Sequence, residues 1–273
     1  MKLLFCGDVV GRSGRQAIND HLPKLRHLLN PDLIIVNAEN AAHGFGMTRA
    51  ICEDLFDLGV GVITGGNHTW DQKEIMSWIH EEPRVLRPIN YPPGTPGYGH
   101  CFYPLPSGKQ VLVINAMGRL FMDPLDDPFY MINELLNEYP MGRDNIAATV
   151  IDFHAETTSE KNSIACYVDG FATLVVGTHT HIPTADARIL PGGTAYQTDA
   201  GMCGDYDSVI GMKKAAPIER FTTKISRERL SPSEGEGTLL GVYVECDEST
   251  GLATRIESVC VGPHLQNHIP TVD

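Results

Sequence analysis

Polar side chains that can hold metal ions follow five short apolar runs of this 273-residue sequence. A lone Asp or His at such a position is more often a helix cap or a satisfied polar group. Five such endings in order along one chain favour a shared site instead. The candidate ligands are Asp8, Glu39, Asn40, Asn67, His154, His179 and His181, and His68 lies among them.

The run Leu174–His181 (LVVGTHTH) ends in two histidines that are separated by one residue. Because side chains alternate along an extended chain, this spacing predicts that His179 and His181 point to the same face. Two neutral imidazoles at the end of a strand suggest metal ligation. An ordinary polar loop is the alternative, since His-x-His pairs also arise by chance.

The candidate ligands offer carboxylate and amide oxygens and imidazole nitrogens, with no thiolate among them. This set of donors disfavours a structural zinc site and suits Mn, Fe, Mg or catalytic Zn. It also exceeds what one tetrahedral ion needs. Two ions about 3.5–4 Å apart that share a carboxylate would use all of these donors, and the chemistry they serve is in-line attack of water on phosphorus.

The elements that must position these residues alternate between strands and helices. Strands are predicted at 2–6, 32–37, 60–64, 110–115 and 147–153, and a short strand begins at 174 and ends in the turn at Gly177. Strand-like segments follow at 188–190, 194–198, 238–246 and 256–261. Helices are predicted at 15–29, 48–58, about 72–80, 129–138 and 158–168. This order predicts a layered α/β sheet, which places ligands beyond the carboxyl ends of its strands.

Three segments are predicted to be irregular. Residues 88–106 are rich in Pro, Gly and Tyr and are expected to form a surface excursion. Residues 117–128 contain two Asp-Pro steps and form a candidate lid or binding loop. Residues 211–237 are polar and poorly periodic, which predicts a long connection. Because no repeat or linker divides the chain, residues 1–273 are expected to form one α/β domain of sandwich type.

Composition limits the partners of the chain. A net charge of −13 argues against a long nucleic acid but allows a small phosphorylated substrate. The sequence has no run of 18 apolar residues, and its N-terminus meets charge too early for a secretory signal, so a cytoplasmic location without a membrane span is expected. Seven scattered cysteines favour reduced thiols in apolar surroundings, with Cys6 and Cys166 as examples.

Four motifs occur in order along the chain: Gly7-Asp8-Val9-Val10-Gly11, Asn37-Ala38-Glu39-Asn40, Gly65-Gly66-Asn67-His68-Thr69-Trp70 and Gly177-Thr178-His179-Thr180-His181. Together they resemble the calcineurin-like metallophosphoesterases, and more narrowly the YmdB-like branch of bacterial cytoplasmic 2′,3′-cyclic-nucleotide 2′-phosphodiesterases. The resemblance runs from residue 1 to about 262. Three departures from the superfamily pattern are features of this branch: Val10 replaces a metal-binding His, Glu39 replaces the bridging Asp, and Thr69 replaces an acidic residue. They leave the metal preference open.

The resemblance implies a calcineurin-like metallophosphoesterase sandwich, with two mixed β-sheets flanked by helices, and two metal ions bridged by Glu39. Fe or Mn is favoured for these ions, with Mg or Zn as alternatives. One ion would be held by Asp8, Glu39, Asn40 and His181, and the other by Glu39, Asn67, His154 and His179. A metal-bridging hydroxide would attack phosphorus while His68 protonates the leaving oxygen. The alternative for His68 is to orient the neighbouring ligands.

The activity that the resemblance implies is hydrolysis of small phosphodiesters, with 2′,3′-cyclic nucleotides opened to 3′-nucleotides. A phosphomonoesterase or nucleotidase is the alternative among enzymes. A regulatory protein with a metal site and only residual hydrolysis is the alternative of a different class. The expected partner is a small phosphodiester or cyclic nucleotide, without long nucleic acid or membrane, and apolar faces of the late strands would allow a homo-oligomer.

Overall fold

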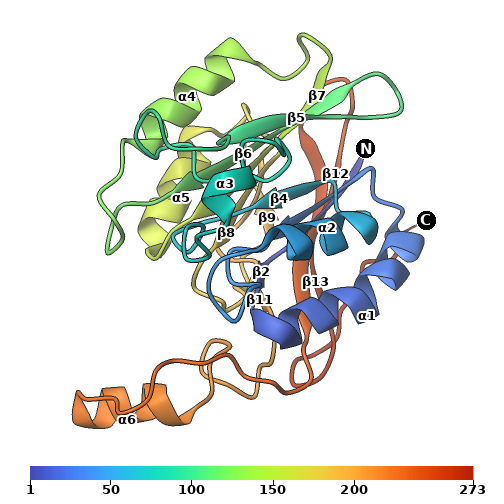
Figure 1. The fold of residues 1–273 in the computed structure, drawn as a ribbon. Helices are drawn as coiled ribbons and strands as arrows, with labels where there is room; N and C mark the ends of the chain where they lie inside the picture. Colours follow the sequence, from blue (N-terminus) through green and yellow to red (C-terminus); the bar gives the residue numbers. More distant parts are fainter. Residues whose placement is uncertain (273) are drawn as a thin grey trace.

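Two large mixed β-sheets with helices on their outer faces make up the computed structural model, which describes residues 1–272 (Figure 1). The strands of the first sheet are β1 (Lys2–Cys6), β3 (Leu33–Asn37), β4 (Val62–Thr64), β12 (Leu239–Cys246) and β13 (Ala253–Val261). Those of the second sheet are β5 (His100–Pro104), β6 (Gln110–Met117), β7 (Ile146–His154), β8 (Leu174–Thr178), β9 (Arg188–Ile189) and β10 (Ala195–Gln197). Strands β2 (Asp8–Val9) and β11 (Met202–Cys203) pair separately. The helices are α1 (Gly11–Leu29), α2 (Arg49–Asp57), α3 (Ile75–Trp78), α4 (Pro128–Glu138), α5 (Thr158–Tyr167) and α6 (Ala215–Thr223).

The strand order explains where a site can form. The first sheet runs β13-β12-β1-β3-β4 and the second runs β5-β6-β7-β8-β10-β9. Strands β1, β3 and β4 are parallel, as are β6, β7, β8 and β10, while antiparallel strands complete both sheets. The predicted ligands therefore lie at or just beyond the carboxyl ends of β1, β3, β4, β7 and β8, as expected for ligand sites of open α/β sheets.

The core has three layers because side chains alternate along each strand. Leu3 and Phe5 of β1 pack between the two sheets, together with side chains of β7 and β8 such as Val150 and Val176. Leu4 of β1 faces the other way and packs with α1 and α2 on the outside of the first sheet. Helices α4 and α5 cover the outside of the second sheet in a third cluster. The predicted α/β sandwich of two mixed sheets is confirmed.

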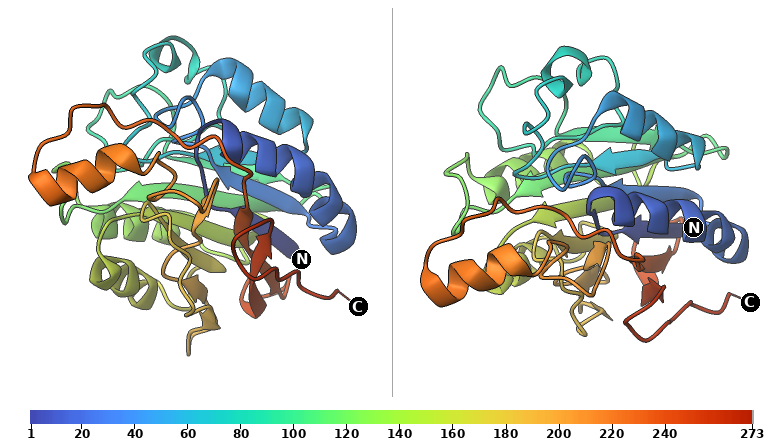
Figure 2. Two further views of the ribbon diagram at one scale, coloured as in Figure 1. Left: turned by 90° about the horizontal axis from the view of Figure 1, so that it is seen from below. Right: turned by 60° about the horizontal axis from the view of Figure 1, so that its bottom comes forward.

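Three predictions about individual elements are wrong. The predicted surface excursion at 88–106 contains β5, which pairs antiparallel with β6, and its Pro and Gly content conceals this short edge strand. The predicted connection at 211–237 contains α6, which stands at the periphery of the molecule (Figures 1 and 2). This helix is only nine residues long, and Ala216 and Pro217 are its only buried residues, so the sequence offers little periodic pattern from which to predict it. The helix predicted at about 72–80 spans only residues 75–78, with turns on either side.

All seven cysteines are free thiols, and six of them are buried. Cys166 is exposed on α5, so the expectation that it lies in apolar surroundings is wrong. Within residues 1–272, no helix is both long enough and apolar enough to cross a membrane.

Candidate metal centre

Four predicted ligands from both sheets converge beyond the strand ends. Oδ1 of Asn67, after β4, lies 2.8 Å from Nε2 of His154, the last residue of β7. The same nitrogen lies 3.2 Å from Oε1 of Glu39 and 3.1 Å from Nδ1 of His179. Glu39, His154 and His179 each offer a ligand atom within 4.8 Å of the other two. Four side chains that are far apart in the sequence, between positions 39 and 179, thus form one cluster.

The remaining predicted ligands adjoin this cluster, with Asn40 and Asp8 next to Glu39 and His154 and with His181 next to Asn40. Nδ2 of Asn40 lies 3.0 Å from Oε1 of Glu39 and 3.1 Å from Nε2 of His181. Asp8 is fully buried, and its Oδ1 lies 3.8 Å from Nδ1 of His154. Glu39 therefore touches both halves of the predicted site. For Asn40 to act as a ligand, its side-chain amide must be flipped by about 180°, so that Oδ1 instead of Nδ2 faces the cluster.

An open cavity of about 390 Å³ gives access to these side chains. Glu39, Asn40, His179 and His181 line it, so a substrate placed there can reach the cluster. His68 also lines it, and the ring of Phe45 stands edge-on to His68 at a centroid distance of 5.0 Å. This cavity is called the metal cavity below.

The predicted extended geometry of the two histidines is wrong. Strand β8 ends at Thr178, and the backbone then bends, with φ of 97° at His179 and 66° at His181. These angles lie in the left-handed region, which side chains other than glycine adopt only when their surroundings hold them there. Both rings line the metal cavity, but the bend rather than strand alternation directs them.

A buried ion pair holds this bend. Oδ2 of Asp199 accepts hydrogen bonds from the backbone N–H of Thr180 at 3.1 Å and from its hydroxyl at 2.7 Å. Nζ of Lys161, on α5, donates to the same oxygen at 2.7 Å, and both charged side chains are only 1% exposed. Oδ1 of Asp199 accepts from the N–H of Gly201, whose carbonyl accepts from the N–H of Asp8. One carboxylate thus connects the histidine bend with the strand of Asp8.

Hydrogen bonds also fix which ring nitrogens face the cluster. The hydroxyl of Thr178 donates to Oδ1 of Asp152, so it accepts from Nδ1–H of His154 at 2.9 Å. Oδ2 of Asp152 accepts from Asn37 and Thr64, which completes a buried network. The carbonyl of Ile210 accepts from Nδ1–H of His181 at 2.8 Å. In both histidines Nε2 is left toward the cluster, as is typical of metal-binding histidines.

The charges of the cluster favour bound cations. Burial raises the pKa of Asp8 well above its usual value, and its Oδ1 has no hydrogen-bond partner among residues 1–272. Burial opposes ionisation of Glu39, but the charge of His154 and its hydrogen bond outweigh burial and lower the pKa of Glu39 to about 2. Burial likewise opposes protonation of His154, but Glu39 and Asp8 raise its pKa to about 9. The carboxylates thus draw a positive charge into this buried position.

Burial and the charge of His154 lower the pKa of His179 to about 3, so this imidazole is neutral, as a metal ligand must be. The backbone of Gly66 passes close to the cluster, where a Cβ atom would overlap Oε2 of Glu39 and Nε2 of His154. The residues present therefore fit a metal centre by their donor types, their unpartnered carboxylate oxygen and this close backbone approach.

His68 stands beside the cluster with one ring nitrogen already engaged. Its Nδ1 lies 2.8 Å from Oδ2 of Asp71, while its backbone N–H donates to Oε2 of Glu39 at 3.0 Å. The Asp71 contact fixes the ring and leaves Nε2 for a substrate. Glu156 contacts the other edge of the site, with Oε2 3.0 Å from Nε2 of His179.

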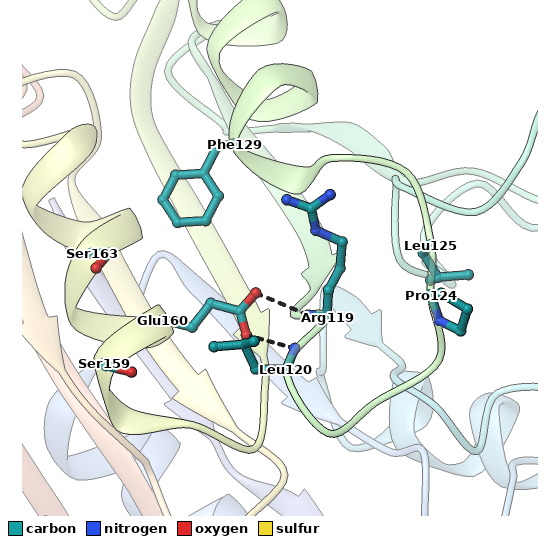
Figure 3. A pocket seen from close by; sticks show the side chains of 8 residues that line it. All are labelled: Arg119, Leu120, Pro124, Leu125, Phe129, Ser159, Glu160 and Ser163. Carbon is teal, nitrogen blue, oxygen red and sulfur yellow. Dashed lines mark hydrogen bonds between the residues drawn. The ribbon is translucent and has the colours of Figure 1, made fainter.

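The candidate lid at 117–128 is anchored at several points. Glu160 of α5 accepts hydrogen bonds from the backbone N–H groups of Arg119 and Leu120, at 2.9 and 3.3 Å (Figure 3). The amide of Asn90 donates to the carbonyls at both ends of the loop, those of Met117 and Asp126. A cavity of about 560 Å³ lies here, larger than the metal cavity and lined by different residues. Its size does not make it the reaction site, because the titratable cluster lies in the smaller cavity.

The fold has a counterpart among solved structures. The solved structure of the calcineurin-like phosphoesterase YfkN from Bacillus subtilis superposes with a TM-score of 0.57, over 96% of this chain and 90% of that chain. Its sequence identity is only 11%, so this likeness concerns the fold alone. The architecture is that of the calcineurin-like phosphoesterases.

The chain belongs to the YmdB-like family, because the family model described as YmdB-like protein matches residues 4–259. It is 48% identical over 261 residues to the 2′,3′-cyclic-nucleotide 2′-phosphodiesterase of Bacillus subtilis (strain 168). The matched region covers 96% of this chain and 97% of that protein. The crystal structure of a novel phosphatase from Mycoplasma pneumoniae is 36% identical, with a TM-score of 0.89 over 96% of this chain and 93% of that chain. The resemblance predicted from the four motifs is confirmed, and the chain is a phosphoesterase.

Proposed function

We propose that the chain is a dinuclear metal phosphodiesterase that hydrolyses 2′,3′-cyclic nucleotides to 3′-nucleotides. The observation that carries this proposal is the position of Glu39, which contacts Asn40 on one side and His154 on the other. The activity for which the Bacillus subtilis relative is named, that of a 2′,3′-cyclic-nucleotide 2′-phosphodiesterase, supports the choice of substrate.

The proposed ligands form two overlapping sets. The first is Asp8, Glu39, Asn40 and His181, and the second is Glu39, Asn67, His154 and His179. Fe or Mn suits these oxygen and imidazole donors, with Mg or Zn as alternatives. When bound, two such ions would lower the pKa of a water at the site and neutralise charge that develops on the phosphoryl oxygens.

The chain's own residues would do the rest of the work. His68 lies on the wall of the metal cavity and would donate a proton to the 2′ oxygen as its bond to phosphorus breaks. Asp71 and Phe45 hold its ring in place through the Nδ1 contact and the edge-on packing. If His68 only orients the ligands, its loss should lower metal affinity rather than the rate of the loaded enzyme.

The proposal includes a small substrate, a cytoplasmic location and no long nucleic acid or membrane as partner, and it allows a homo-oligomer. Two competing functions remain to be tested against it. A phosphomonoesterase would release phosphate from 3′-AMP, and a regulatory protein would hold metal with only residual hydrolysis.

The test is hydrolysis of 2′,3′-cyclic AMP, 3′,5′-cyclic AMP and 3′-AMP by one preparation, with products separated by chromatography and metal content measured in parallel. We expect 2′,3′-cyclic AMP to be cleaved fastest, with 3′-AMP as the accumulating product. Glu39→Gln should lose both bound metal and activity, whereas Glu53→Gln, at an exposed position of α2, should lose neither. Faster cleavage of 3′-AMP, or full activity in Glu39→Gln, contradicts the proposal.

A further inference from the structure

A second cavity adjoins the metal cavity across an apolar wall. It has a volume of about 290 Å³ and lies beside the arm that carries α6 (the α6 arm, residues 213–230). Its lining comes from residues 209–212, from α6 and from Leu230. Ile210, Met212 and Leu230 line both cavities, so the two spaces meet at these side chains. A ligand held by the metal centre can therefore extend into this second space, called the arm cavity below.

The arm cavity combines flat apolar surface with one cationic group. Phe221 lines it and is 77% exposed, which leaves an aromatic face open to a ligand. Ile210 is 48% exposed at the junction with the metal cavity. Arg220 is the charged residue of the lining, and its guanidinium offers N–H donors but no acceptor. A nucleobase has π faces that stack on an aromatic ring and edge acceptors that a guanidinium can bind.

The charge of the arm agrees with an anionic ligand. Residues 213–230 contain six Lys or Arg side chains and two Glu side chains. Lys213 and Lys214 pair with Glu234 and Asp207 outside the arm, and counting these two carboxylates leaves a net charge of +2 in a chain whose total is −13. A local positive region beside the site attracts a nucleotide even though the whole chain is acidic. The cavity is concave and shares three lining side chains with the metal cavity, which favours a part of the substrate over a second copy of the chain as its occupant.

We propose that the arm cavity binds the nucleobase of a substrate whose cyclic phosphate lies at the metal centre. The base stacks on Phe221, and Arg220 donates hydrogen bonds to acceptors at its edge. This inference rests on the proposed phosphodiesterase function and adds a site of substrate discrimination to it. It assigns the exposed α6 arm to recognition rather than to the chemical step.

The test compares two substrates: 2′,3′-cyclic AMP and methyl riboside 2′,3′-cyclic phosphate, which has the same reacting group without a base. The measured quantity is kcat/KM for 2′,3′-cyclic AMP divided by kcat/KM for the methyl riboside. In Phe221→Ala we expect this ratio to fall roughly tenfold through a higher KM for the nucleotide, since stacking of one base on an aromatic ring has about this effect. Arg220→Met should lower the ratio in the same direction.

Matched controls come from the same arm. Ile225 is 69% exposed and Arg227 is exposed, and both lie outside the lining of the arm cavity. Ile225→Ala and Arg227→Met should therefore keep the wild-type ratio. If Phe221→Ala does not fold, Phe221→Leu keeps an apolar side chain without the aromatic face and should lower the ratio as well.

The outcomes separate this inference from the function on which it rests. If the wild-type protein cleaves neither substrate, the proposed function fails and the inference falls with it. If it cleaves both and the ratio is unchanged in Phe221→Ala and Arg220→Met, only the nucleobase site is overturned. Native mass is measured by light scattering for each variant. A fall in mass together with the change in ratio would assign Phe221 to contact between copies of the chain and overturn the proposal.

Discussion

Removing the charge of Lys161 should strongly destabilise the protein without touching the metal centre directly. Lys161 and Asp199 are each 1% exposed, and their charged atoms lie 2.7 Å apart. In Lys161→Met the carboxylate stays buried and keeps only its hydrogen bonds from Thr180 and Gly201. Breaking a buried pair on one side costs about 3–5 kcal/mol of unfolding free energy.

The assay is urea unfolding of metal-stripped protein, followed by circular dichroism. Lys213→Met is the matched control, because Lys213 forms its pair with Glu234 at 3.2 Å in an exposed position, with side chains 52% and 71% exposed. This control should cost only about 0–1 kcal/mol. The double variant Lys161→Met/Asp199→Asn should recover part of the loss, since neither charge then remains buried.

A second measurement tests what the pair does for the histidine bend. Asp199 holds Thr180 between the two candidate ligands His179 and His181. The double variant Lys161→Met/Asp199→Asn should therefore bind metal more weakly in isothermal titration, even at temperatures where it is fully folded. Conversely, if Lys161→Met and Lys213→Met lose the same stability within 1 kcal/mol, the buried pair does not have the energetic role described.

Three further results are expected. Gly66→Ala should keep its fold by circular dichroism but lose metal binding in titration, because the new Cβ would overlap Glu39 and His154; normal metal affinity would show that the cluster relaxes around a methyl group. Thr178→Val should weaken metal affinity about 10–100-fold by cutting the link from Asp152 to His154; an unchanged dissociation constant would argue against that link. Chelation of the metal should abolish hydrolysis and lower the melting temperature, since a ligand that binds only the folded state stabilises it. Addition of Mn²⁺ or Fe²⁺ should restore both the activity and the melting temperature. A chelated protein with full activity would exclude a metal role.

The sequence was sufficient to predict the sandwich because its strands are apolar and alternate with amphipathic helices. Strands β3 and β7 are buried throughout, and such runs are visible without knowledge of their neighbours. The candidate ligands follow from the same pattern, because the carboxyl ends of parallel strands gather in one place. Their convergence was therefore predictable, whereas the bend at His179 and His181 depends on Asp199, a residue distant in sequence.

The residues that support the cluster carried no comparable signal. Lys161 and Glu160 occupy the buried face of α5, where helical periodicity predicts apolar side chains. Asp152 lies in an apolar strand, and only the meeting of β3, β4, β7 and β8 shows what it binds. The sequence does not predict the arm cavity for another reason. Helix α6 packs on neither sheet, and its exposed Phe221 belongs to no motif or periodic apolar pattern that would indicate a binding surface.

The most direct test of the central claim is the location of metal ions in crystals of the protein as purified, by anomalous scattering together with the measured metal content. We expect two ions per chain, both in contact with Glu39, with Asp8 and His181 near one and Asn67 and His179 near the other. A single ion, or ions bound away from Glu39, would contradict the dinuclear centre and the phosphodiesterase function proposed from it.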